Sequence, residues 1–142
     1  MSPYRRRPAP VHDQRGAGLS VAAAVLLPCL ILAGGLAVDG AQQARARRQA
    51  HAVAAAAART GCDHASAAEL VGRPDPAAAR RAAMAAAGAT SGEGATMSAR
   101  AELEGGRLSV TVDATRATLI LSVVGLDTVT GSATVTCLLV PR

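Results

Sequence analysis

The stretch from Ala17 to Val38 constrains this chain most, because its 22 successive residues include no Asp, Glu, Arg, Lys or His. As a helix it would be about 33 Å long at ~1.5 Å per residue, close to the ~30 Å thickness of a bilayer's hydrocarbon core. A core helix of a small soluble domain is shorter and carries a polar stripe, which this stretch lacks. We therefore expect a transmembrane helix over residues 17–38 that stays in the mature protein.

A cleaved secretory signal is the main alternative. The apolar region of such a signal is usually about 7–15 residues long and is followed by a small-residue cleavage site. The stretch here is longer, and Asp39 interrupts the small residues of the candidate segment AVDGA. We interpret Asp39 as an interfacial residue that tolerates solvent at the membrane edge.

The charge of the chain is +5 and comes from arginine, with no lysine present. Single-stranded nucleic acid would need aromatic stacking platforms, and Tyr4 is the only aromatic residue. The membrane surface explains the charge better, so we expect lipid and no nucleic acid as a partner. Six arginines flank the apolar stretch: Arg5, Arg6, Arg7, Arg45, Arg47 and Arg48.

The two ends of the chain are expected on opposite sides of the membrane. The excess of arginine before the span is slight, and long domains translocate largely regardless of such counts. We favour a cytoplasmic N-terminus and an extracytoplasmic C-terminal part. The Pro/Arg-rich residues 1–16 form a basic tail that we expect to be disordered.

Alanine and arginine dominate the residues after the span, and both are strong helix formers. The sequence therefore predicts a stalk helix over residues 39–60 that continues the transmembrane helix. Gly61 is the natural C-terminal stop for this helix. A second, short helix is predicted from Pro76 to Ala87, with Asp75 as its N-cap.

The last third of the chain changes to β-type patterning. Met97–Leu103 and Arg107–Ala114 alternate apolar and polar residues around a Gly-Gly pair, which indicates a hairpin. Val129–Val140 alternates too and is predicted as a third strand. The apolar run Ala117–Leu126 fits either a buried strand or a short helix, because periodicity does not separate the two.

These elements predict an α+β fold in which residues 61–142 form a small exported domain. The domain would contain the short helix and a three-stranded antiparallel sheet. A sheet of this size needs cover on one face, which either the stalk helix or a partner must supply.

Three cysteines are present, and Cys29 lies within the span as a small apolar residue. Cys62 and Cys137 are the candidate disulfide if the domain is exported. Their loop of about 75 residues would contribute on the order of 4 kcal/mol in the chain-entropy model. The alternative is a pair of unpaired buried thiols.

Candidate chemistry is sparse. Cys62, Asp63 and His64 resemble metal ligands, but structural zinc needs paired clusters and no second cluster exists. Glu102 and Glu104 share one face of a predicted strand, which an exposed face explains. We expect no catalytic residue, no metal, no cofactor and no enzymatic activity.

The order of features resembles a known group of proteins. Arg15-Gly16 opens the span, Pro28 lies within it, and Asp39 closes it. The helix segment ARARRQAHAVAAAAARTG follows, and the C-terminal segment is VVGLDTVTGSATVTCLLVPR. This resembles the TadE/TadG-like family of Flp-type (tight adherence) pilus assembly proteins, in the small actinobacterial style.

The resemblance implies a non-enzymatic, single-pass component of a pilus assembly or secretion apparatus. Its partners would be other assembly components in the membrane, with the span as a candidate surface for homo- or hetero-oligomers. Some family members are pseudopilins cut after a Gly that precedes a Glu by about five residues. Gly16 matches that Gly, but Val21 stands where the Glu would be, so the resemblance favours an uncleaved TadG-like protein.

Two other functions remain open from the sequence. The first is an exported binding module released by signal cleavage. The second is a membrane-bound regulator whose small domain lies in the cytoplasm.

Overall fold

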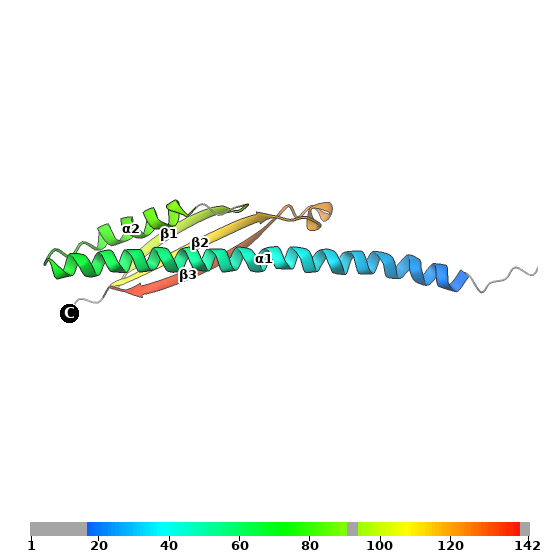
Figure 1. Cartoon of the computed structure of the whole chain (residues 1–142), viewed down its shortest axis with the longest axis horizontal. Helices are drawn as coiled ribbons and strands as arrows, with labels where there is room; N and C mark the ends of the chain where they lie inside the picture. Colours follow the sequence, from blue (N-terminus) through cyan, green and yellow to red (C-terminus); the bar gives the residue numbers. More distant parts are fainter. Residues whose placement is uncertain (1–16, 91–93, 140–142) are drawn as a thin grey trace, which may run out of the picture. The chain divides into compact units, whose positions relative to one another are not determined.

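The structure is a computed structural model, and it describes residues 17–90 and 94–139. The expected disordered tail and Gly16 therefore lie outside the described residues. The elements follow in the order α1 (Ala17–Leu70), α2 (Pro76–Ala89), β1 (Thr96–Glu104), β2 (Arg107–Ala117), η2 (Leu121–Val124) and β3 (Thr128–Leu138) (Figure 1). Two helices and a three-stranded antiparallel sheet confirm the predicted α+β class.

The described part of the chain divides into two compact units, one up to Gly34 and one from Gly35 onward. The first unit contains the N-terminal part of α1, where residues 18–34 are all exposed. Among the described residues, α1 is the one helix long and apolar enough to cross a membrane. An apolar surface this long is expensive to leave in water, which agrees with the predicted span.

In the second unit, one stripe of α1 is buried against the rest of the fold. The stripe consists mostly of small residues that recur at helical spacing, three, four or seven positions apart, as one helix face requires. Its fully covered members are Gly35, Asp39, Ala46, Ala50, Val53, Ala54, Ala57, Ala58 and Gly61. The stalk helix together with α2, rather than a partner, therefore supplies the cover that the sheet needs.

The expectation that Gly61 ends the helix is wrong, because α1 continues to Leu70. A Cβ at Gly61 would lie 2.5 Å from Cδ2 of Leu108 and 3.0 Å from the carbonyl oxygen of Ala79. Glycine here serves close packing. The true stop is Gly72, with φ of 70°, where the N–H groups of Gly72 and Arg73 return to carbonyls of the last turn.

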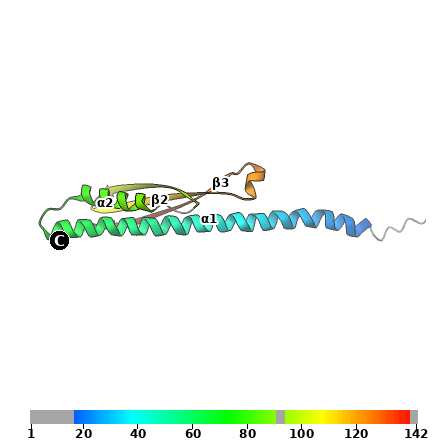
Figure 2. The ribbon, with the colours of Figure 1, turned by 45° about the horizontal axis from the view of Figure 1, so that its top comes forward.

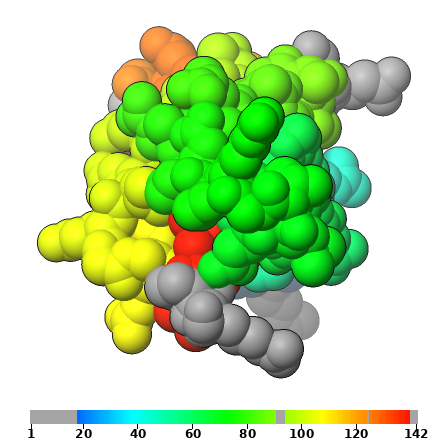
Figure 3. All heavy atoms as spheres, turned by 90° about the vertical axis from the view of Figure 1, so that its left-hand side faces the viewer, coloured from blue at the N-terminus to red at the C-terminus, as the bar shows by residue number. Residues whose placement is uncertain are grey.

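Helix α2 begins as its sequence predicts. The Asp75 carboxylate accepts a hydrogen bond from the N–H of Ala78 at 2.9 Å, and Pro76 occupies the first turn. The helix ends at Ala89, two residues beyond the predicted end. Figure 3 shows the end of α1 and the neighbouring α2, both green, packed against each other beside the yellow and red strands.

The strands form a meander in the order β1-β2-β3. Gly105 and Gly106 both have positive φ, as a two-residue hairpin turn requires, and they place Glu104 opposite Arg107. In β2, alternate residues from Leu108 to Ala114 are buried, while the residues between them form the opposite, outer face. Figure 2 shows α2 and the C-terminal part of α1 running alongside the strands.

The core is built mostly from alanine, and its largest fully buried apolar side chains are Leu108, Val110 and Val112. Small side chains allow the backbones to approach closely. At Gly131 of β3, a Cβ would lie 2.6 Å from the carbonyl carbon of Ala46 and 2.8 Å from the Cα of Arg47. Such a core buries little area per residue, so polar and covalent links matter more than in an aromatic core.

Candidate functional site: the helix–loop junction at Asp39

Asp39 stands on α1 directly after the apolar stretch, and its side chain is buried, with 1% of the residue exposed. Its carboxylate accepts three backbone hydrogen bonds, from Leu119 at 2.9 Å, Ile120 at 3.2 Å and Leu121 at 2.7 Å. The interpretation of Asp39 as a solvent-exposed interfacial residue is therefore wrong. The first N–H groups of a helical turn lack internal partners, and this carboxylate supplies the acceptor.

These hydrogen bonds also set the charge state of Asp39. The bond from the Leu119 N–H lowers the pKa of the carboxyl group, burial opposes that shift, and the bonds from Leu121 and Ile120 lower the pKa further. The net direction is downward, so the group is ionised at neutral pH. Asp39 is thus a fixed negative charge held by backbone dipoles at the end of the apolar stretch.

The segment that donates these hydrogen bonds to Asp39 is a loop whose two ends are bonded to each other. After β2 ends at Ala117, the buried Thr118 donates its N–H to Asp127 at 3.0 Å and its hydroxyl to the carbonyl of Leu126. Between these residues lies the 3-10 turn Leu121–Val124, which ends at Gly125 with φ of 85°. The run Ala117–Leu126, left open between strand and helix, is therefore a loop that contains one short 3-10 helix and no strand beyond Ala117.

The loop carries apolar side chains that the fold does not cover. Leu119 is 64% exposed, Val123 is 85% exposed and Leu126 is 57% exposed. Ile120 instead rests on α1, where a Cβ at Gly35 would lie 2.5 Å from its Cγ2 atom. Gly35 is buried under this side chain, four residues before Asp39 and on the same helix face.

A second polar contact holds the same end of the sheet to α1. Arg116, near the end of β2, donates from its guanidinium to the side-chain oxygen of Gln49 at 2.7 Å. Gln49 is ten residues along α1 from Asp39, so the contacts of Asp39 and Gln49 fix this end of β2 and the loop along about 15 Å of helix.

The other end of the sheet is linked covalently. The structure joins Cys62 of α1 to Cys137 of β3 by a disulfide, with the two Cα atoms 6.5 Å apart. Cys29 is a free, exposed cysteine on the N-terminal part of α1. The two ends of the sheet are thus attached to one helix, through a disulfide at one end and the Asp39 and Gln49 contacts at the other.

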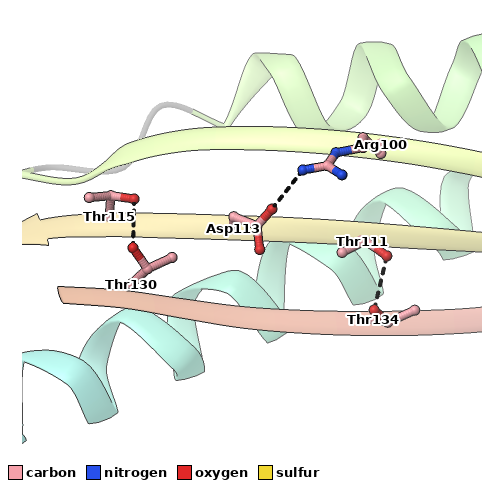
Figure 4. A network of polar contacts seen from close by, with 6 residues as sticks. All are labelled: Arg100, Thr111, Asp113, Thr115, Thr130 and Thr134. Carbon is pink, nitrogen blue, oxygen red and sulfur yellow. Dashed lines mark hydrogen bonds and ion pairs between the residues drawn. The ribbon is translucent and has the colours of Figure 1, made fainter.

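The outer face of the sheet is polar. Three hydroxyl pairs span β2 and β3, and Figure 4 shows two of them, Thr111 with Thr134 at 2.9 Å and Thr115 with Thr130 at 3.2 Å. Figure 4 also shows Arg100 of β1 reaching Asp113 of β2, at 3.5 Å. The face therefore carries three paired hydroxyl groups across β2 and β3 and one ion pair across β1 and β2.

The structure does not bring together the ligands of a metal site within the described residues. Asp63 and His64, adjacent to Cys62 in the sequence, are both exposed. Glu102 and Glu104 are likewise exposed on β1, as the outward face of a strand explains. A groove at the end of α1, lined by Glu69, Asp75 and the ends of the strands, contains the N-cap contact of α2.

Sequence reasoning missed the junction at Asp39, because its partners lie 80 to 82 residues away along the chain. One signal was available. Gly35 and Asp39 are four residues apart, so they continue the buried stripe of α1 into the apolar stretch. A lone carboxylate on a stripe of small residues indicates a buried contact better than it indicates solvent.

The comparisons with known proteins bear on the same helix. No curated protein and no solved structure matched the chain. Residues 16–69 match the family model described as "Putative Flp pilus-assembly TadE/G-like". The match covers α1 almost from end to end, including Gly35 and Asp39. The resemblance to TadE/TadG-like pilus-assembly proteins is thereby confirmed, and residues 16–69 are the part of the chain that carries it.

Proposed function

We propose that the chain is a non-enzymatic, membrane-anchored component of a Flp/Tad-type pilus assembly or secretion apparatus. The observation that carries the proposal is the family match over residues 16–69. The matched segment contains both the apolar stretch and the helix on which the sheet is built. The role is mechanical and associative: one helix fixes the protein in the bilayer and presents the folded domain to other components.

The proposed topology has a cytoplasmic N-terminus and an extracytoplasmic domain. The exposed apolar surface over residues 18–34 supports a single-pass anchor. The disulfide between Cys62 and Cys137 supports export, because such bonds persist in oxidising compartments and are rare in the cytosol. The proposal therefore includes this bond in the mature protein.

Retention of the anchor is favoured over release by signal cleavage. A cut within the AVDGA segment would fall at Asp39, inside α1 and beside three of its backbone contacts. Release there would leave a frayed helix end where the structure has a buried junction. This supports an anchor that stays in the mature protein.

Within the family, we propose the TadG-like form. The absence of Glu at position 21, occupied by Val21, speaks against pseudopilin processing after Gly16. Mass analysis of the mature N-terminus tests this directly. An intact N-terminal segment supports the TadG-like form, whereas a chain that begins at Ala17 would show TadE-like processing.

The proposed partners are other assembly components in the membrane. The exposed residues of α1, among them the small pair Ala33 and Ala37, allow a second helix to approach closely. The hydroxyl face of the sheet provides a separate surface outside the membrane. These surfaces lie in different environments, so one protein can link a membrane component to an external one.

A gene deletion with matched complementation tests the function. The full chain should restore the number of pili per cell, and a version with residues 17–38 replaced by a cleavable signal should be exported without restoring them. Normal pilus numbers in the deletion strain would overturn the proposal. Full rescue by the released domain would overturn the anchored role.

A further inference from the structure

We propose that the apolar loop, Leu119–Leu126, inserts into the boundary between headgroups and acyl chains on the domain side of the membrane, beside the point where α1 leaves it. The inference rests on the proposed anchoring. It adds a second membrane contact that the family match, which ends at residue 69, does not cover.

The depth of the loop follows from its contacts with α1. Ile120 packs on Gly35, and the Asp39 carboxylate holds the backbone at Leu119, Ile120 and Leu121. Gly35 lies within the uncharged stretch, about 4–5 Å before its end at Val38. A side chain that rests on Gly35 is therefore at the depth of the last turn of the span.

A span that ended before Gly35 would leave the loop in water, but such a span would be too short to cross the bilayer. Residues 17–34 alone give a helix of about 27 Å, which is shorter than the ~30 Å hydrocarbon core. Including residues up to Val38 gives about 33 Å. The bilayer boundary therefore falls nearer to Val38 than to Gly34, at the level where the loop contacts the helix.

The chemistry of the loop suits this position. From Thr118 to Leu126 it carries no charged residue, and it exposes Leu119, Val123 and Leu126. Among the charged residues around the loop, Asp39 is turned inward and satisfied by backbone N–H groups, whereas Arg116 and Asp127 stand at the base of the loop, outside Leu119–Leu126. An interfacial loop must expose apolar side chains while pairing its polar groups, and this one does both.

Arginines mark the outer limit of the same layer. Arg45, Arg47 and Arg48 are exposed on α1 about 9–14 Å beyond Asp39. Their long side chains can turn back toward lipid phosphates. The loop therefore lies at the end of the hydrocarbon core, on the membrane side of these three arginines, in the region where apolar side chains partition into lipid.

The chain suits a depth measurement, because it contains no Trp and its single aromatic residue is Tyr4. Three single-tryptophan variants of the full chain are reconstituted into phosphatidylcholine–phosphatidylglycerol vesicles, with and without brominated acyl chains. Val123→Trp reports on the loop, and Leu27→Trp reports on the span. Leu138→Trp is the matched control, since Leu138 is also exposed but lies at the opposite end of the sheet, opposite Arg107.

The expected result is at least a two-fold loss of emission in brominated vesicles for Val123→Trp and Leu27→Trp, with Leu138→Trp unchanged. If Leu27→Trp is quenched and Val123→Trp is not, the loop inference fails while anchoring stands. If neither is quenched, anchoring fails and the inference fails with it. Quenching of all three would mean that the whole sheet lies on the lipid, which also overturns a loop-specific contact.

Discussion

At the scale of single residues, Asp39 decides how the loop is held. One carboxylate accepts three N–H groups from consecutive residues, which an ionised acid can do because both of its oxygens accept hydrogen bonds. Charge-assisted bonds of this kind are stronger than neutral ones. The ordering of the loop therefore depends on a side chain 80 residues away.

Asp39→Asn should loosen the loop without unfolding the sheet. An amide oxygen accepts at most two of the three bonds, and the amide NH2 then faces a backbone donor. We expect a lower thermal midpoint and faster amide hydrogen exchange at Leu119, Ile120 and Leu121. Asp63→Asn is the matched control, since Asp63 is exposed on the same helix. Unchanged exchange at the three amides would contradict the role assigned to Asp39.

The stability difference between the wild type and Asp39→Asn should depend on pH. The folded pKa of Asp39 lies below its ordinary value of 3.8, so the unfolded state binds the proton more readily. The contribution of Asp39 is therefore fully present above that value and is lost as the pH falls through the folded pKa. Urea unfolding in detergent should show the two midpoints converging in acid. A gap that widens in acid would contradict the shift.

Gly61 is required by close packing, whereas Gly40 on the same helix has open space around it. Gly61→Ala should lower the unfolding free energy by roughly 1–2 kcal/mol, because overpacking against Leu108 and Ala79 outweighs a helix-propensity gain of about 1 kcal/mol. Gly40→Ala, on α1 with no atom within 4 Å of the added Cβ, should be neutral or stabilising. Chemical denaturation measures both, and a stabilised Gly61→Ala would refute the close contact.

At the scale of elements, local signals predicted most of the fold. The N-cap at Asp75, the Gly105-Gly106 turn and the alternation in β2 each lie within a few residues of what they determine. The predicted end of α1 was wrong because Gly61 and Gly72 are both plausible helix stops in the sequence. The tertiary fold packs Gly61 against Leu108 and Ala79, which explains the glycine there without a helix end. The helix stops at Gly72 instead. The conformation of the loop could not be predicted from its own sequence, because the acceptor of its N–H groups, Asp39, lies on α1.

A disulfide links the two elements α1 and β3. Replacing Cys62 and Cys137 together with Ala should reduce the unfolding free energy by up to about 4 kcal/mol, since the bond closes a loop with a separation of 75 residues. Urea denaturation in detergent measures the loss. Cys29→Ala should have no effect, and a reductant should bring the wild type to the level of the double variant. A wild type insensitive to reductant would refute a stabilising bond.

At the scale of the whole molecule, one helix presents two different surfaces. Its N-terminal part is exposed and apolar. Its C-terminal part forms one side of a core built mostly from alanine. The domain is attached to this helix near Asp39 and again at Cys62. Helix and sheet therefore form one structural unit from Gly35 onward, and the account requires that this unit lie outside the cytoplasm.

The most direct test is labelling of Ser98→Cys, in a Cys29→Ser background, with a membrane-impermeant maleimide. Ser98 is exposed on β1, and the disulfide leaves no other thiol. The account predicts labelling in intact, wall-stripped cells and recovery of the labelled chain in the alkaline-washed membrane pellet. Labelling only after lysis, or a labelled chain freely soluble after the wash, would contradict it.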